Sequence, residues 1–512
     1  MTTRNWRHSR LFLLLSWLLP IVIIGGLFGG CTGKGDSSAE DLITDPVKID
    51  SGYISGTVTG DPGKEVRVYR GIPYAASTAG ENRWRPPQPV TPWSGVRQCT
   101  EYGNASPQVA TPFSPGPYSE DCLYLNVTTP AKRKSERLPV MVWFHGGGYS
   151  IGSGHNTRTY NWPALPQHGV VLVTVNHRLS VMGLFAHPAL SAESPNRVSG
   201  NYLFLDLIAA LQWIQRNIAA FGGDPKNVTI FGESGGGAKV DALVASPLAK
   251  GLFHRAICQS GVDFGSKDLK EIESLGERFV QKLGLAEEKD VLAALRAIPW
   301  ERMVSANLEL GRELGTTGRG YSGAFERLAV DGWFMPDKPE NIYAQGKQNK
   351  VPLITCANEG EIIAEKSFLV MPQLIGLYVK RLQGMRNVGV NAYAVLFSQV
   401  PSNWKKEGVL AYHGLEIPYV FGDLESINTQ GHFLIFAKPS GASQQDSGLT
   451  ADDYALSELM MNIWVQFART GDPNIKDVVT WPVWEPTTDQ YLELKWKPEV
   501  KSGYSRIAPG KR

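Results

Sequence analysis

The residues with the clearest capacity for chemistry lie in the segment Gly232-Glu233-Ser234-Gly235-Gly236. This segment follows the β-branched run Asn227 to Phe231, and apolar residues at helical spacing continue from Ala238. A G-x-S-x-G sequence between a strand and a helix raises the serine hydroxyl on a tight turn, and its glycines permit the close backbone packing that such a turn needs. The pattern predicts that Ser234 is a nucleophile. A turn without chemistry is the alternative, and the flanking strand and helix weigh against it.

Backbone amides that could stabilise an oxyanion are predicted in a second glycine-rich segment, His145-Gly146-Gly147-Gly148-Tyr149, directly after an apolar run that ends at Phe144. Consecutive glycines expose their N–H groups, so we expect Gly147 and Gly148 to act together with the N–H of Gly235. Each such donor stabilises the transition state of acyl transfer by roughly 3 kcal/mol. A flexible glycine turn is the alternative for this motif alone, but the order of the two motifs favours an oxyanion hole.

The general base is expected to be a histidine beyond the nucleophile, because strand-turn-helix serine sites present their triad in the order Ser, acid, His. Three histidines qualify, His254, His413 and His432. His254 leaves too little chain for an intervening acid, and no predicted element ends near His432. His413 follows the apolar run Asn391 to Phe397. Order along the chain favours His413 but does not by itself exclude a structural role for it.

The acid is expected at the end of the predicted strand Val351 to Cys356, which continues as Ala357-Asn358-Glu359-Gly360-Glu361. Glu359 is the first candidate, because it follows the strand directly and precedes a permissive glycine. It would orient the imidazole of the base and stabilise the imidazolium. Glu361 is the second candidate, and the residue types alone do not separate the two.

The elements that must position these residues are predicted to be alternating strands and helices. Leu138 to Phe144, Val170 to Val175 and Asn227 to Phe231 are short apolar runs typical of strands covered on both faces. Between the last two lies a run with apolar residues at steps of three and four, from Phe204 to Ile218, which predicts an amphipathic helix. This order predicts an α/β fold with a mostly parallel sheet, helices on both faces and the site at the carboxyl ends of the strands.

Composition narrows the classes of function. The chain has 512 residues, of which 42% are hydrophobic and 20% charged, so it can bury a large core. Its net charge of +2 arises from dispersed charges, which is unlike the basic surface of a nucleic-acid-binding protein. No Cys-x-x-Cys pair or histidine cluster indicates a metal site. Small or neutral substrates fit better. The serine and oxyanion motifs, rather than composition, indicate a small-molecule or lipid-like ester and a reaction without a cofactor, and the oligomeric state stays open.

The N-terminus has the features of an export signal. Arg4, Arg7 and Arg10 precede the uncharged stretch Leu11 to Gly30, which is long enough for a signal peptide or a membrane helix. Cys31 follows and resembles the lipidated cysteine of a bacterial lipoprotein. We expect a leader at residues 1–31, a polar tether at 32–50 and a single catalytic domain at 51–512. The predicted location is the bacterial cell envelope, by a lipid or helical anchor, or the periplasm or medium. Cys258 and Cys356 lie in apolar runs and are expected to be buried.

Further motifs occur almost from end to end of the chain. With these motifs the chain resembles the type-B carboxylesterases, the group of bacterial para-nitrobenzyl esterases and animal cholinesterases. Besides the segments already named, the resemblance rests on Gly71-Ile72-Pro73-Tyr74-Ala75, Glu120-Asp121-Cys122-Leu123-Tyr124-Leu125-Asn126-Val127, Phe221-Gly222-Gly223-Asp224-Pro225, Val330-Asp331-Gly332, His413-Gly414-Leu415-Glu416-Ile417-Pro418-Tyr419 and Phe467-Ala468-Arg469-Thr470-Gly471-Asp472-Pro473.

The resemblance implies an α/β-hydrolase fold and ester hydrolysis through an acyl-enzyme on the serine. It implies Glu359 rather than Glu361 as the acid, because the family acid stands directly before this glycine, and it implies His413 as the base. Ser260 matches a second serine that supports the acid. The family usually has alanine where this chain has Gly235, which keeps the backbone donor and should preserve activity.

The resemblance also implies structural features outside the triad. Arg83 with Glu120, and Arg178 with Asp206, match buried structural ion pairs. The cysteine that commonly pairs with Cys122 is replaced by Ser106, so a disulfide is expected with Cys99 instead.

The short stretch between Glu359 and His413 implies a reduced helical roof over the site, which would admit bulkier lipid or polyester substrates as an alternative to short esters. The segment before Ser119 lacks the tryptophan that binds choline in cholinesterases. A silent adhesion protein is the remaining alternative, but such relatives typically lose the nucleophile.

Overall fold

A mixed sheet of 11 strands forms the centre of the part of the chain that the structure describes. The computed structural model describes residues 41–111, 114, 116–155, 159–263, 265–316, 322–361, 371–429 and 446–507. The strand order is β16-β15-β14-β13-β10-β9-β7-β8-β6-β4-β3. The strands are β3 (Thr57–Thr59), β4 (Val66–Pro73), β6 (Tyr124–Thr129), β7 (Leu138–Phe144), β8 (Val171–Val175), β9 (Gly223–Glu233), β10 (Arg255–Gln259), β13 (Leu353–Asn358), β14 (Ala392–Phe397), β15 (Gln490–Leu494) and β16 (Glu499–Ser502).

The seven neighbouring strands β15, β14, β13, β10, β9, β7 and β8 pair in parallel. Antiparallel pairs occur only towards the two edges of this sheet as described. A second sheet joins β1 (Val47–Ile49), β2 (Gly52–Ser55) and β5 (Val96–Gln98), and a third pairs β11 (Lys267–Asp268) with β12 (Ala329–Val330). The predicted α/β class and mostly parallel sheet are confirmed. The predicted strand from Leu138 to Phe144 has the same bounds as β7.

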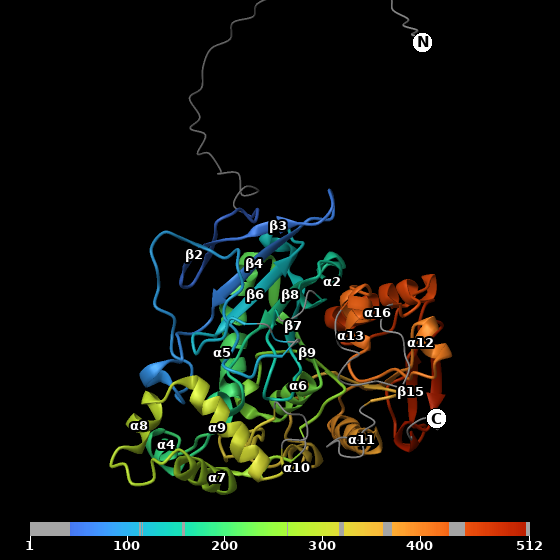
Figure 1. Cartoon of the computed structure of the whole chain (residues 1–512). Coiled ribbons are helices and arrows are strands. Elements are labelled where there is room, and N and C mark those ends of the chain that lie inside the picture. The colour runs from blue at the N-terminus through green and yellow to red at the C-terminus, as the bar shows by residue number, and fades with distance from the viewer. Residues whose placement is uncertain are drawn as a thin grey trace, which may run out of the picture. The chain divides into compact units, whose positions relative to one another are not determined.

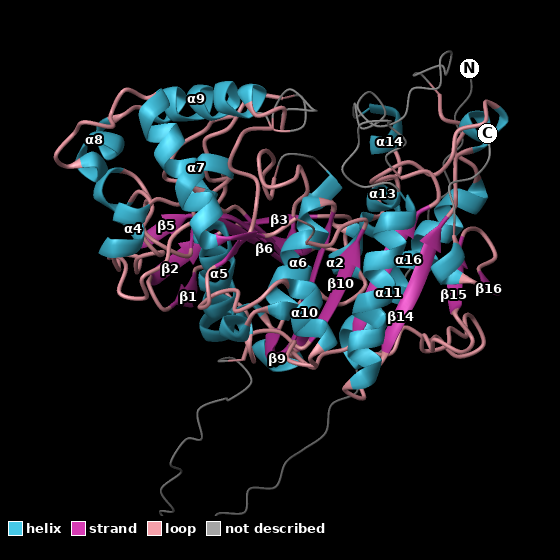
Figure 2. Ribbon diagram, turned by 90° about the horizontal axis from the view of Figure 1, so that it is seen from below, coloured by secondary structure: helices cyan, strands magenta, loops and turns pink. Residues whose placement is uncertain are grey.

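Alternate residues of β7 belong to two different cores, one on each face of the sheet. Val140 and Val142 pack in a core with residues of α5 (Tyr202–Asn217), α6 (Gly235–Ala245) and α11 (Met371–Asn387). Met141 and Trp143 pack in the other core, with α13 (Glu416–Phe421) and α16 (Ala451–Thr470). Successive side chains of a strand point to opposite faces, so a continuous apolar run requires helices on both. Figure 2 shows these helices in front of and behind the strands.

Figure 1 shows α4, α7, α8 and α9 gathered in one group, apart from α12, α13 and α16. The remaining α-helices are α2 (Ala164–Gln167), α3 (Ser180–Leu184), α4 (Pro188–Glu193), α7 (Leu269–Lys282), α8 (Val291–Ala297), α9 (Trp300–Glu313), α10 (Pro339–Ala344), α12 (Ser402–Lys406) and α14 (Ser426–Thr429). Short 3-10 helices are η1 (Gly80–Asn82), η2 (Lys134–Glu136), η3 (Thr159–Asn161), η4 (Ile218–Phe221), η5 (Pro247–Ala249) and η6 (Tyr504–Arg506).

The catalytic unit begins earlier than the sequence predicted. Residues from Asp41 onward belong to the same unit as the sheet, whereas the boundary was expected at residue 51. Ile43 is buried and donates its N–H to the Lys132 carbonyl at 2.9 Å, and Val47 and Ile49 are buried in β1. Alternating apolar residues therefore make residues 41–50 part of the fold rather than of a tether. The predicted leader at 1–31, with Cys31, lies outside the described residues.

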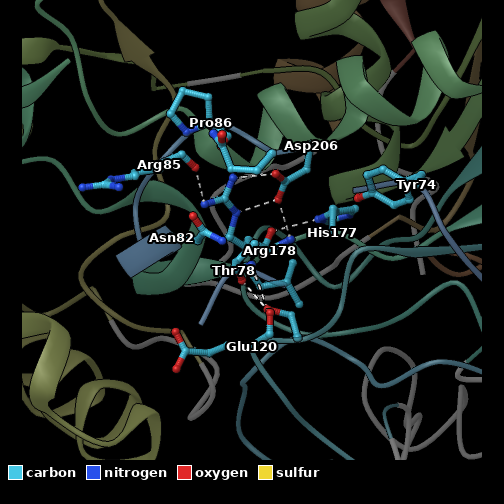
Figure 3. A network of polar contacts seen from close by, with 12 residues as sticks. Tyr74, Thr78, Asn82, Arg85, Pro86, Glu120, His177, Arg178 and Asp206 are labelled. Atoms are coloured by element: carbon cyan, nitrogen blue, oxygen red, sulfur yellow. Dashed lines mark hydrogen bonds and ion pairs between the residues drawn. The ribbon is translucent and has the colours of Figure 1, made fainter. Parts of the chain in front are cut away.

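Two buried ion pairs brace the loops at the carboxyl ends of the strands. Arg178 donates from Nε to Asp206 Oδ2 at 2.9 Å and from its terminal nitrogen to Oδ1 at 2.6 Å (Figure 3). Arg83 donates from Nε to Glu120 Oε1 at 2.6 Å. Both pairs that the family resemblance implied are thus present and buried. Arg178 follows β8 and therefore fixes the segment next to the loop that leaves β7.

The predicted disulfide between Cys99 and Cys122 is wrong, because both cysteines carry free, buried thiols. Burial raises the pKa of Cys99 to about 11 and that of Cys122 further. The two thiols lie in different surroundings: Cys99 faces Arg97 and Asp45, whereas Cys122 lies beside Ser106, Asp206 and Arg178. Cys258 and Cys356 are buried in β10 and β13, as predicted.

Candidate active site

Ser234 lies in a strained turn between β9 and α6. Its backbone has φ 57° and ψ −122°, a conformation that L-residues rarely adopt and that costs about 1–3 kcal/mol. Its N–H donates to the Gln259 carbonyl at 2.8 Å. A Cβ atom on Gly232 or Gly236 would overlap the Phe144 carbonyl at the end of β7. The glycines are therefore required by the close approach of β7, and the predicted turn is observed.

The oxyanion loop, His145 to Tyr149, runs directly past this turn. Gly147 and Gly148 have φ of 84° and 64°, which favour glycine, and the loop is closed by the Ile151 N–H donating to the Gly147 carbonyl at 3.2 Å. Within the described ranges, no hydrogen bond uses the N–H of Gly147, Gly148 or Gly235. A Cβ atom on Gly235 would overlap the Gly148 carbonyl, so the alanine usual in the family would force this loop to shift.

His413 lies beside the turn with a carboxylate on each side of its ring. Its Nδ1 is 2.6 Å from Glu361 Oε2, and its Nε2 is 3.1 Å from Glu233 Oε1. All three side chains are buried. The predicted base is therefore held by one carboxylate at Nδ1, and its second nitrogen faces the residue that precedes Ser234.

The carboxylate at Nδ1 belongs to Glu361, not to Glu359 as the family resemblance implied. The chain turns at the end of β13, where the Glu361 N–H donates to the Asn358 carbonyl at 3.3 Å. After this turn Glu361 forms a β-bridge with Tyr412, next to His413. Glu359 is half-buried near Glu493 of β15, and burial and that carboxylate raise its pKa. The assignment of Glu359 is thus corrected by the geometry of the turn.

A layer of polar groups holds Glu361 and its neighbour Glu416. The Asn358 N–H donates to Glu361 Oε1 at 2.8 Å, and its side-chain amide donates to Glu416 Oε2 at 2.6 Å. Gln259 donates to the other oxygen of Glu416 at 3.1 Å. Burial raises the pKa of Glu416, against the hydrogen bond from Asn358. Buried carboxylates are costly unless they are hydrogen-bonded, and these contacts meet that requirement.

Ser260 does not make the contact that the resemblance implied. Its N–H donates to the Cys356 carbonyl at 2.7 Å, and its backbone has φ 46°. Among the described residues, its buried hydroxyl has no hydrogen-bond partner. Ser260 therefore lies near the end of β13 without bonding either Glu359 or Glu361.

The sequence interpretation missed Lys239, which is 0% exposed in α6 one turn beyond Ser234. Its Nζ donates to the His145 carbonyl at 2.8 Å. Burial lowers the pKa of Lys239 to about 7, although Glu233 favours the charged form. A lysine in the segment Gly235 to Ala245, which is small and apolar except for Lys239 and Asp241 and whose residues are all buried, was the signal that could have found it.

The turn, the oxyanion loop and the paired imidazole define a serine hydrolase of the α/β class. In the residues that the structure describes, no cluster of three His, Cys, Asp or Glu side chains is arranged to hold a metal ion. The Carboxylesterase family model matches residues 44–374 and 374–508, and the chain belongs to this family.

Individual relatives agree with this assignment. The chain is 33% identical over 494 residues to fumonisin B1 esterase of Sphingopyxis macrogoltabida, with 86% of each chain covered. It is 32% identical over 484 residues to para-nitrobenzyl esterase of Bacillus subtilis, covering 86% of this chain and 93% of that one. A solved structure of a PNB esterase aligns with a TM-score of 0.74 at 28% identity, covering 89% of this chain and 96% of the other. The protein is a carboxylic ester hydrolase.

The two acids can be separated by a matched pair of substitutions. We expect Glu361→Gln to lower kcat by about 10⁴-fold, since an amide no longer orients the ring or stabilises the imidazolium. Glu359→Gln, two positions away, should leave kcat within a few-fold of wild type. Steady-state hydrolysis of a p-nitrophenyl ester measures both. Loss of activity in Glu359→Gln, with Glu361→Gln active, would restore Glu359 as the acid.

The buried lysine predicts a specific dependence of stability on pH. Burial lowers the pKa of Lys239 in the folded chain to about 7, against the ordinary lysine value of 10.5. Between these values the unfolded chain holds a proton that the folded chain has released, so wild type gains stability as the pH rises. Below pH 7 the penalty for burying the charge is fully present.

We therefore expect the difference in unfolding free energy, Lys239→Met minus wild type, to be largest below pH 7. It should fall by about 1.4 kcal/mol per pH unit above that. Urea unfolding at several pH values measures the difference, with the exposed Lys250→Met as control. A difference that is constant with pH would contradict the burial of a titrating Lys239.

Proposed function

We propose that the protein hydrolyses carboxylic esters through an acyl-enzyme on Ser234, with His413 as general base and Glu361 as the acid that orients it. The observation that carries this proposal is the 2.6 Å contact between His413 Nδ1 and Glu361 beside the strained turn of Ser234. In this arrangement the Nδ1–H donates to Glu361 and leaves Nε2 to accept a proton.

In the first step, the Ser234 oxygen bonds to the ester carbonyl carbon as its proton passes to His413 Nε2. The N–H groups of Gly147, Gly148 and Gly235 stabilise the resulting oxyanion. The tetrahedral intermediate collapses with cleavage of the C–O bond, and the leaving alcohol takes the proton from Nε2. Water then repeats the sequence: its proton passes to Nε2, its oxygen bonds to the acyl carbon, and Ser234 leaves with the proton.

Glu233 has a part in this scheme because it lies 3.1 Å from Nε2. Its carboxylate faces the ring nitrogen that receives the proton of Ser234. Two carboxylates near the ring stabilise the imidazolium that forms. Glu233 thereby supports the charged intermediate state without carrying the proton itself.

The relatives support a substrate from the class of carboxylic esters. One is named as a fumonisin B1 esterase and another as a para-nitrobenzyl esterase, and both align over most of this chain. We propose small or lipid-like esters as substrates here, with the alcohol and acyl groups set by the residues around the turn. Residues 362–370, part of the short stretch expected to leave the roof open, lie outside the described residues, so the open roof stays a prediction.

The nucleophile can be tested by labelling and by kinetics together. Ser234→Ala should lower kcat for p-nitrophenyl butyrate by about 10⁶-fold, because no other hydroxyl is held on the turn. A fluorophosphonate should label wild type stoichiometrically and leave Ser234→Ala unlabelled, while the exposed Ser305→Ala is labelled as wild type. Activity or labelling that survives in Ser234→Ala would refute the proposal.

We also propose that the chain is exported and held at the cell envelope through its N-terminus. The support is the sequence: three arginines, the uncharged stretch Leu11 to Gly30, and Cys31 before a polar segment. In the part of the chain that the structure describes, no helix is both long and apolar enough to span a bilayer.

Lipidation at Cys31 is tested by palmitate incorporation in a bacterial host. Wild type should incorporate labelled palmitate and sediment with membranes, and Cys31→Ser should lose the label. The buried Cys99→Ser is the matched control and should keep it. Wild-type protein without label would contradict lipidation and leave a cleaved signal or a helical anchor.

A further inference from the structure

The buried side chain of Lys239 links the two halves of the site. Lys239 follows Ser234 by five residues on α6, the helix that begins at the nucleophile. Its Nζ donates at 2.8 Å to the carbonyl of His145, the first residue of the oxyanion loop. The Nζ also lies 5.9 Å from the ring centroid of Tyr149, the last residue of that loop. One side chain thus contacts both ends of the loop from the nucleophile's own helix.

The groups around Lys239 include two stacked histidine rings and one carboxylate, that of Glu233. His145 and His177 stack with ring centroids 4.6 Å apart, and burial together with the Lys239 charge lowers the pKa of both rings well below the usual range. Neutral imidazoles offer no counter-charge. Glu233 is the carboxylate that favours the ammonium form of Lys239. The amine of Lys239 is therefore buried next to the turn of Ser234 at a cost in folding free energy.

The middle of the oxyanion loop has no side chains that could hold it in place. Gly146, Gly147 and Gly148 carry no side chains to pack, and the last two have positive φ. The contact with the turn is tight, since even a Cβ on Gly235 would overlap the Gly148 carbonyl. Donors displaced by 1 Å from a reacting group can cost about 100-fold in rate. Fixing the distance between the loop and the turn therefore preserves the reaction rate, although burying the amine costs stability.

We propose that Lys239 is a positioning residue that ties the oxyanion loop to the nucleophile's helix and so fixes the oxyanion donors relative to Ser234. This inference rests on the proposed function of Ser234 and of the loop amides. Lys239 touches neither substrate nor the reacting atoms; it acts through the His145 carbonyl. Because Ser234 caps the N-terminus of α6 and Lys239 lies within it, a movement of the helix would move the loop and the nucleophile together.

The test replaces Lys239 by methionine, which has a similar length and no donor, and uses Lys250→Met as the matched exposed control. We expect Lys239→Met to lower kcat by about 10- to 100-fold with KM within about threefold, since the loss is in transition-state stabilisation. Lys250→Met should match wild type in both constants. Unchanged kcat in a folded Lys239→Met would overturn the proposal.

A comparison of an ester with its thionoester reports on the oxyanion hole directly. Sulfur accepts hydrogen bonds weakly, so wild type should hydrolyse the ester much faster than the thionoester, and a displaced hole should reduce that preference. We expect the ester-to-thionoester ratio of kcat to fall at least threefold in Lys239→Met. A ratio equal to that of wild type, with lower kcat, would assign Lys239 a merely structural role.

Lys239→Gln keeps the test decisive if the methionine variant does not fold. Glutamine is neutral and one bond shorter, so its amide reaches the His145 carbonyl less well. Its kcat and its ester-to-thionoester ratio should lie between those of wild type and Lys239→Met. A glutamine variant with both values unchanged would also overturn the proposal.

Fluorophosphonate labelling separates this proposal from the one on which it rests. Lys239→Met should still be labelled to full stoichiometry at Ser234, only more slowly, because the nucleophile and its base are intact. Slower but complete labelling supports a displaced oxyanion loop. Wild type that is not labelled at Ser234 would instead remove the proposed nucleophile, whatever the Lys239 variants show.

Discussion

The contact between the His413 imidazole and the Glu361 carboxylate joins segments that are far apart in the chain, and the rest of the site is arranged around it. Both groups are buried, and a buried carboxylate is stable only with hydrogen-bonding partners. Asn358 supplies one partner to Glu361 and another to Glu416, and Gln259 completes the set. These residues come from the ends of β13 and β10 and from α13, so the contact depends on the parallel order of the sheet.

The sheet brings the remaining parts to the same edge. β7 leads into the oxyanion loop, β9 into the turn of Ser234, and β13 into the turn of Glu361. The cores on the two faces hold these strands rigidly, and the Arg178–Asp206 pair fixes the neighbouring loop after β8. Lys239 then connects the oxyanion loop to α6. Rigid strands set the coarse position of each group, and buried polar contacts set the fine one.

Local pattern was sufficient to predict the features that depend on local physics. The apolar run of β7 needs two covered faces, and the G-x-S-x-G pattern between an apolar run and a helical run indicates the turn of Ser234, so both could be predicted from residue types. The choice between Glu359 and Glu361 depends on a turn whose direction is set by pairing with Tyr412, distant in the chain. The thiols of Cys99 and Cys122 and the bond of Lys239 likewise depend on tertiary neighbours that no local pattern specifies.

The most direct test of this account is a crystal structure of the enzyme phosphonylated at Ser234. The account predicts that the imidazole of His413 lies between the modified serine and Glu361, and that the phosphonyl oxygen accepts hydrogen bonds from the N–H groups of Gly147, Gly148 and Gly235. An adduct in which Glu359 holds the imidazole, or in which the phosphonyl oxygen points away from the oxyanion loop, would contradict it.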